Sequence, residues 1–195
     1  RGGASTLTLA DETSAVLRLR SVGRDHAEAV AAPTSTRTER NAIRMLRDDL
    51  VEWYLNGPLG LEQGFELSER PAGEGALHVA VGVEGLVPTL AEGYVSLRDA
   101  AGHEKLRYSD LFAYDAEGDD VPARLAVVDG SIVLEVDDRD ARYPLVIDPL
   151  ITSQQARVDN PEAAKSGQYG ATMASALAAS ASWVVVGAPY DDREA

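Results

Sequence analysis

The sequence contains no cysteine among its 195 residues, and this absence excludes several kinds of site. A chain without cysteine forms no disulfide, offers no thiolate to a metal and has no cysteine nucleophile. Histidine is also scarce: His26, His78 and His103 lie far apart and match neither H-x-H nor H-E-x-x-H spacing. We interpret all three as structural or solvated side chains.

Positive charge is in deficit, with 18 Lys and Arg against 32 Asp and Glu and a formal net charge of −14. Such a chain cannot displace the counterions of a phosphate backbone, which argues against nucleic-acid binding. It also argues against adsorption to an anionic membrane. No apolar run approaches the roughly 20 residues that cross a bilayer, so we expect no membrane span.

Catalytic motifs are missing as well. The sequence has no G-x-S-x-G elbow, no P-loop and no G-x-G-x-x-G spacing. With only two Trp and two Phe, it offers little aromatic surface on which a glycosidase could place a sugar. We therefore expect a protein that is not an enzyme. A hydrolase that uses an acidic pair such as Asp137 and Asp138 is the weakest alternative.

What the sequence does contain is alternation of apolar and polar residues. Residues 6–23 read as two half-buried strands around a turn at Asp11-Glu12, and residues 76–83 alternate again. Strand-like segments recur about every ten residues with few helical patterns between them, which is typical of a β-sandwich. The fold class predicted for residues 1–151 is therefore all-β and sandwich-like.

Three segments in this region are interpreted individually. Residues 29–41 are small and polar and include Pro33, so we predict a loop. A helical turn is predicted just before a strand over Leu50–Leu55. The apolar run "YPLVIDPLI" predicts a strand buried on both faces, with Pro144 and Pro149 marking its ends because proline lacks an N–H donor. Tyr143 and Asp148 belong to this same structural segment.

Turns are predicted at residues 100–102, 117–118 and 129–130. The strongest is Asp129-Gly130, which lies between "RLAVV" and "SIVLEV". Both residues adopt positive φ readily, as a two-residue type I′ hairpin turn requires.

Carboxylates gather in "DAEGDD", where Asp115, Glu117 and Asp119 alternate as calcium ligands do. Gly118, however, breaks the D-x-[DN]-x-[DN]-G order of a calcium loop. An acidic solvated turn is the preferred interpretation, and calcium at these three residues is the lesser alternative. No other cofactor is expected.

Composition changes after Ile151, where Ala, Ser and other small residues become frequent. We place a domain boundary at 150–152 and assign residues 152–195 to a single supersecondary unit, since they contain too few large apolar residues for an independent core. This segment ends in "WVVVGAPYDD", an apolar run followed by a turn.

That unit resembles one FG-GAP repeat, the β-propeller repeat of integrin-α-like and bacterial surface proteins. Tyr169-Gly170 stands where the family has Phe-Gly, Trp183–Val186 would be the central strand, and Gly187-Ala188-Pro189 matches the turn that ends the repeat. Residues 52–67 and 141–151 resemble the β-rich domain that precedes such repeats. Only one repeat is present, although propellers have about four to eight blades, and the family's calcium loops have no clear counterpart here.

The resemblance implies a non-enzymatic adhesion or binding module of a secreted or cell-surface bacterial protein, with a protein or surface ligand as partner. The opening "RGGASTLTLA", without Met, and the lone repeat suggest a piece of a longer protein. The alternative is a structural subunit whose C-terminal strand adds to the sheet of another copy.

Overall fold

The alternating patterns become strands in the structure, a computed structural model that describes residues 4–9, 11–24, 28–153, 176–180 and 183–187. Within these ranges every regular element is a β-strand and none is a helix. Accordingly, the described part of the chain has no helix that could cross a membrane.

The strands form two sheets. Sheet A has the order β12-β13-β8-β2-β1-β16-β15, with β3 beside β2. Its strands are β1 (Ala4–Thr8), β2 (Ser14–Gly23), β3 (Glu28–Ala29), β8 (Leu77–Glu84), β12 (Ala123–Val128), β13 (Ser131–Val136), β15 (Ala176–Ser180) and β16 (Trp183–Gly187). Neighbouring strands are antiparallel except β1 and β16, which are parallel.

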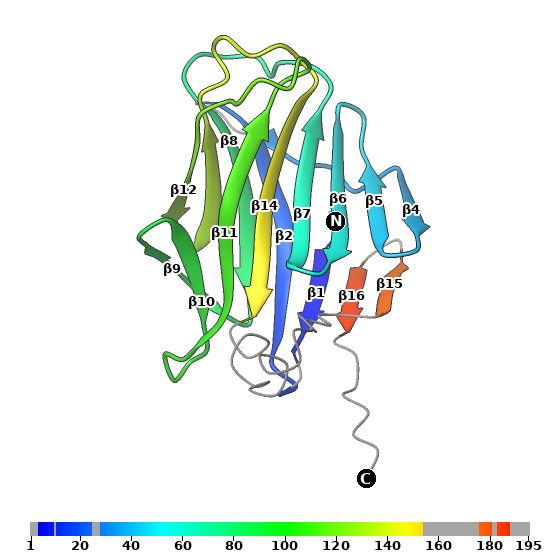
Figure 1. Cartoon of the computed structure of the whole chain (residues 1–195), viewed down its shortest axis with the longest axis vertical. Coiled ribbons are helices and arrows are strands. Elements are labelled where there is room, and N and C mark those ends of the chain that lie inside the picture. Colours follow the sequence, from blue (N-terminus) through cyan, green and yellow to red (C-terminus); the bar gives the residue numbers. More distant parts are fainter. Residues whose placement is uncertain (1–3, 10, 25–27, 154–175, 181–182, 188–195) are drawn as a thin grey trace, which may run out of the picture.

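Sheet B has the order β4-β5-β6-β7-β14-β11-β10-β9 and is antiparallel throughout. Its strands are β4 (Ser35–Glu39), β5 (Ala42–Leu46), β6 (Leu50–Gly57), β7 (Gly60–Leu67), β9 (Val87–Ala91), β10 (Tyr94–Arg98), β11 (Glu104–Tyr114) and β14 (Leu145–Ser153). The two sheets lie face to face, with β7, β14 and β11 on the near side in Figure 1.

The core fills the space between the sheets. One continuous cluster joins Leu17 and Val79 of sheet A to Tyr54, Phe65 and Ile147 of sheet B, all fully buried. Alternate residues of central strands such as β2 and β14 are buried in this cluster, as expected for two sheets that each bury one face. The predicted all-β sandwich-like fold is thus confirmed.

Two predictions near the start of sheet B were wrong. Residues 29–41 contain β4, whose mostly exposed side chains explain the loop prediction: an edge strand buries little and needs few apolar residues. The predicted helical turn before Leu50 is strand β5, with Ile43 and Met45 buried. The helical spacing of Ile43, Leu46 and Leu50 was coincidental because Leu50 belongs to the next strand.

The prediction for "YPLVIDPLI" was wrong in two respects. Strand β14 does not end at Pro149 but continues to Ser153, and its residues alternate between buried and half-buried. Pro149 is tolerated within a central strand because its pairing with β11 shifts register there, between Ser109 and Phe112. At such a bulge the missing N–H of proline leaves no ladder bond unmade.

The run "WVVVG" forms strand β16. Its two edges pair with β1 and β15, so within this structure it extends sheet A. The division into domains 1–151 and 152–195 remains a prediction, although β14 extends two residues past the expected boundary.

Candidate functional site

The acidic turn at Asp115 is held together by backbone donors. One carboxylate oxygen accepts the amide N–H groups of Glu117 at 2.9 Å and Asp119 at 3.1 Å, and the other accepts that of Arg142 at 3.0 Å. The Arg142 amide does most to hold the pKa of Asp115 below its ordinary value. Asp115 therefore caps a turn.

The calcium hypothesis gains no support from this arrangement. The Glu117 carboxylate pairs with the Arg142 guanidinium. Across the described ranges, the His, Asp and Glu side chains make no group of three or more that could hold a metal ion.

Asp137 and Asp138 are adjacent in sequence but have different partners. Asp138 is buried, accepts two bonds from Arg24 Nη2 at 3.0 and 2.7 Å, and accepts the Tyr143 hydroxyl at 2.5 Å. Asp137 is partly exposed and accepts a bond from Arg139 Nε at 2.8 Å. The two carboxylates therefore do not face a common site, as a cooperating catalytic pair would. Asp138 instead has a structural role, because it links Arg24 to Tyr143 by hydrogen bonds.

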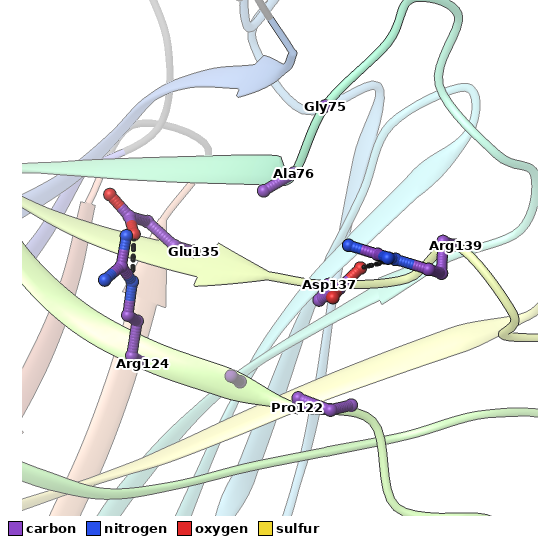
Figure 2. A pocket seen from close by; sticks show the side chains of 8 residues that line it. Gly75, Ala76, Pro122, Arg124, Glu135, Asp137 and Arg139 are labelled. Atoms are coloured by element: carbon purple, nitrogen blue, oxygen red, sulfur yellow. Dashed lines mark hydrogen bonds and ion pairs between the residues drawn. The ribbon is translucent and has the colours of Figure 1, made fainter.

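A hollow of about 520 Å³ opens on sheet A beside β12 and β13. Figure 2 shows its charged side chains, with Arg124 directed at Glu135 and Arg139 at Asp137. All four charges are paired with one another, and both arginines are mostly exposed. Such exposed pairs contribute little to stability, and each cation already has its counterion.

A second hollow, of about 630 Å³, lies on the outer face of sheet B and has a different character. We call it the outer-face hollow. Its lining includes Leu59, Glu62, Tyr94, Phe112, Asp148 and Leu150. These residues come from the β6–β7 turn and from β7, β10, β11 and β14, which lie side by side in Figure 1.

Strand register explains how these residues meet. Leu150 pairs with Glu62 on β7 and with Ser109 on β11, while Asp148 pairs with Phe112. Because neighbours in register share one face of a sheet, all of these side chains point outward, away from the core. The bulge at Ser109–Phe112 keeps Phe112 on this outer face.

Large apolar side chains are exposed around the hollow. Leu59 is 76% exposed, Phe112 64% and Tyr114 39%. The outer face of a half-buried antiparallel strand normally alternates to polar residues, so an exposed phenylalanine in the middle of the sheet is informative.

Asp148 lines the hollow and has no hydrogen-bond partner within the described residues. Its Oδ1 atom is buried without a hydrogen bond. Burial, and secondly the charge of Glu62, raise the pKa of Asp148 to about 6. Within the described part of the chain, neither Asp148 nor Glu62 has a hydrogen bond or an ion pair.

The cationic residue in the lining of this hollow already has partners. Arg107 also lines the hollow, but its guanidinium bonds Glu104 at 2.5 Å and lies 4.6 Å from the centre of the Tyr94 ring. The outer-face hollow therefore combines exposed aromatic surface with two uncompensated carboxylates.

The structural residues predicted from the sequence are placed as follows. Asp129 and Gly130 have φ angles of 48° and 71° in the turn between β12 and β13, as a type I′ hairpin requires. The Tyr143–Pro144 peptide bond is cis and leads into β14. Trp183 and Gly187 begin and end β16. Tyr169, Gly170, Ala188 and Pro189 lie outside the described residues.

Sequence reasoning missed Leu59, Glu62 and Phe112. One signal pointed to the site: Asp148 is the only charged residue within "YPLVIDPLI". A lone carboxylate in an apolar central strand is costly unless it is paired or has a function. Its neighbours could not be identified from the sequence because they depend on sheet order.

Comparisons of the chain with protein-family models, with curated proteins and with solved structures find no match.

Proposed function

We propose that this chain is a non-enzymatic binding module that docks a partner protein or surface ligand on the outer face of sheet B. One observation carries the proposal: the hollow is lined by exposed Phe112 and Leu59 and by Asp148, whose Oδ1 atom is buried without a hydrogen bond. A docked partner would cover the apolar side chains and supply the missing donor. Both changes favour binding.

The chemistry of the face is that of a binding surface. Aromatic side chains at the centre of an interface commonly contribute much of its binding energy, and Phe112 offers an exposed aromatic side chain at this hollow. The lining of the hollow also includes the polar residues Ser109, Asp110 and Thr152. Protein interfaces commonly combine apolar and polar side chains.

The context proposed for this module is a secreted or cell-surface bacterial protein, in which it precedes an FG-GAP-type propeller. The support is the ordered set of motifs in the sequence, which ends in Gly187-Ala188-Pro189. The alternative is self-assembly through the C-terminal strand. Since β16 is already paired on both edges, that route would require β16 to leave β1 and exchange between copies.

The binding proposal is tested with a random dodecapeptide library displayed on phage and selected against the full chain. Selected peptides are then measured on the double variant Leu59→Ser/Phe112→Ser. Both side chains are exposed, so serine should leave the fold intact. We expect the affinity of the selected peptides to fall at least about tenfold, as for loss of a central aromatic contact.

Val128→Ser is the matched control, because Val128 is also an exposed apolar residue, 50% exposed, but belongs to sheet A. Its affinity for the selected peptides should equal that of the wild type. Peptides that bind the double variant as tightly as the wild type would overturn the proposal.

A further inference from the structure

The charges of the outer-face hollow are out of balance. Its lining holds three carboxylates, Glu62, Asp110 and Asp148, and one cation, Arg107, whose counterion is Glu104. Asp110 accepts a hydrogen bond from the Ser109 hydroxyl at 2.7 Å. None of the three carboxylates has a cation as partner within the described residues, and two of them, Glu62 and Asp148, have no hydrogen bond there either.

Glu62 and Asp148 are close enough to share one cation. Glu62 pairs with Leu150, so Asp148 lies two residues along β14, in the diagonal position on the same face. Diagonal neighbours on adjacent strands are about 7–8 Å apart, within reach of long side chains. A single ammonium or guanidinium group between them would contact both carboxylates.

Aromatic surface lies beside this point. Phe112 pairs with Asp148 across β11 and β14, and its ring is open to solvent. The same hollow already holds one cation against an aromatic ring, Arg107 over Tyr94. A cation that reaches Asp148 past Phe112 would gain both an ion pair and a contact with the ring.

The buried Oδ1 atom of Asp148 distinguishes a cationic ligand from a neutral one. A backbone amide or a sugar hydroxyl could donate to this oxygen but would leave two neighbouring carboxylates uncompensated. A lysine or arginine side chain donates and also neutralises, which removes the repulsion between Glu62 and Asp148.

We propose that the outer-face hollow binds a lysine or arginine side chain of a partner polypeptide, with its charged group between Glu62 and Asp148 and an adjacent apolar residue on Phe112. This inference rests on the proposed function and specifies its ligand. The overall charge of −14 adds long-range attraction for a basic partner.

The test uses two defined probes, the capped tripeptides acetyl-Leu-Lys-Leu-amide and acetyl-Leu-Gln-Leu-amide. Each is titrated into the ¹⁵N-labelled full chain at pH 7.5 and low salt, and the amide resonances are followed by NMR. We expect the lysine peptide to shift the resonances of Glu62, Phe112 and Asp148. Its affinity should exceed that of the glutamine peptide at least fivefold.

Charge-removing variants show whether this preference arises at the proposed site. In Glu62→Gln/Asp148→Asn the two peptides should bind equally. Asp110→Asn is the matched control, because it removes a carboxylate of the same hollow that already accepts a hydrogen bond. In this variant the ratio of the two peptide affinities should remain at least half of the wild-type ratio. Dissociation constants in the low-millimolar range are sufficient for this test, because it compares the affinity of the lysine peptide with that of the glutamine peptide.

The outcomes separate this inference from the function on which it rests. Equal binding of both probes to the wild type overturns the cation site, even where phage-selected peptides still depend on Phe112 and Leu59. A lysine preference that survives Glu62→Gln/Asp148→Asn overturns it too. If the phage-selected peptides bind Leu59→Ser/Phe112→Ser as tightly as the wild type, the proposed binding face is overturned as well.

Discussion

Asp148 is the residue on which the candidate site depends, and its protonation links the site to stability. Burial and the charge of Glu62 raise its pKa in the folded chain from 3.8 to about 6. The fold therefore favours the protonated carboxyl. The resulting stabilisation is fully present below about pH 4 and is lost as the pH rises through about 6.

Asp148→Asn should therefore stabilise the chain at pH 7.5, since asparagine keeps the shape of the side chain and removes the buried charge. A shift of about two pKa units corresponds to about 1–3 kcal/mol after allowance for partial exposure. Urea unfolding at pH 7.5 and at pH 4 measures this gain. The variant should be more stable at pH 7.5, and the difference should nearly vanish at pH 4.

Asp110→Asn is the control for that measurement. Asp110 lies in the same hollow, is exposed and has a φ of 48°, a conformation that asparagine also adopts readily. Its unfolding free energy should change by less than about 0.5 kcal/mol at both pH values. If Asp148→Asn instead loses stability at pH 7.5, the interpretation that the unpaired charge of Asp148 destabilises the fold is wrong.

Individual residues were predictable from the sequence where their role depends on near neighbours. Asp129-Gly130 is an example, because the hairpin turn needs only two adjacent residues with positive φ. Asp148 was identified as a structural residue of its strand. Its pairing with Phe112 and its proximity to Glu62 come from strands far away in sequence, so no local pattern could reveal them.

Among the elements, β7 contains a glycine whose role also depends on a neighbouring strand. Gly64 pairs with Trp53 of β6, and a Cβ atom at position 64 would lie 1.9 Å from the Trp53 ring. The ring therefore lies across the glycine on the outer face. Glycine weakens a strand by itself, and an aromatic ring packed over it compensates.

Gly64→Ala should consequently destabilise the chain by displacing Trp53, although alanine is normally the better strand residue. We expect a loss of about 1–3 kcal/mol in the free energy of unfolding, as for overpacking, together with a changed near-ultraviolet circular dichroism spectrum. Chemical denaturation of the purified full chain measures the first effect.

A double-mutant cycle with Trp53→Ala isolates the cause. Without the ring, Gly64→Ala should be neutral or slightly stabilising, so the two substitutions should couple by at least about 1 kcal/mol. Additive effects would mean that the cost arises in the β7 backbone and not from the ring.

Elements were predictable where alternation was strong and missed where an edge position weakened it. β2 and β8 were expected because their apolar residues alternate and are buried on one face. The sequence predicts a loop at β4 because an edge strand has few buried side chains. It predicts a helical turn at β5 because this strand is short and its apolar spacing fits both periods.

For the whole molecule, composition and strand spacing were enough to predict a sandwich but not the order of its strands. β14 lies between β7 and β11, and β8 lies between β2 and β13. These neighbours are distant in sequence, and such pairings depend on the complete core. The outer-face hollow follows from this order, because β7, β14 and β11 must be adjacent to bring Glu62, Asp148 and Phe112 together.

The strand order also predicts which residues unfold together as one cooperative unit. Within sheet A, β16 pairs with β15 and with β1, so β1 is its one link to the other strands of that sheet in the described part of the chain. We therefore expect a chain that ends at Ser153 to fold. The denaturant m value of the main unfolding transition should match that of the full chain, because m scales with the surface exposed on unfolding. If residues 154–195 belong to the same cooperative unit, m should instead fall by roughly a fifth, in proportion to chain length.

Sedimentation velocity on both chains gives the second half of this test. Oligomers that grow with concentration in the full chain and disappear in the shorter one would favour assembly by exchange of β16, since loss of that strand removes the only element to be exchanged. Monomers in both, with equal m values, would favour a sandwich that acts alone and leave the outer face of sheet B as its binding surface. A shorter chain that fails to unfold cooperatively would contradict the boundary, because the β1–β16 pairing would then be required to close the sandwich.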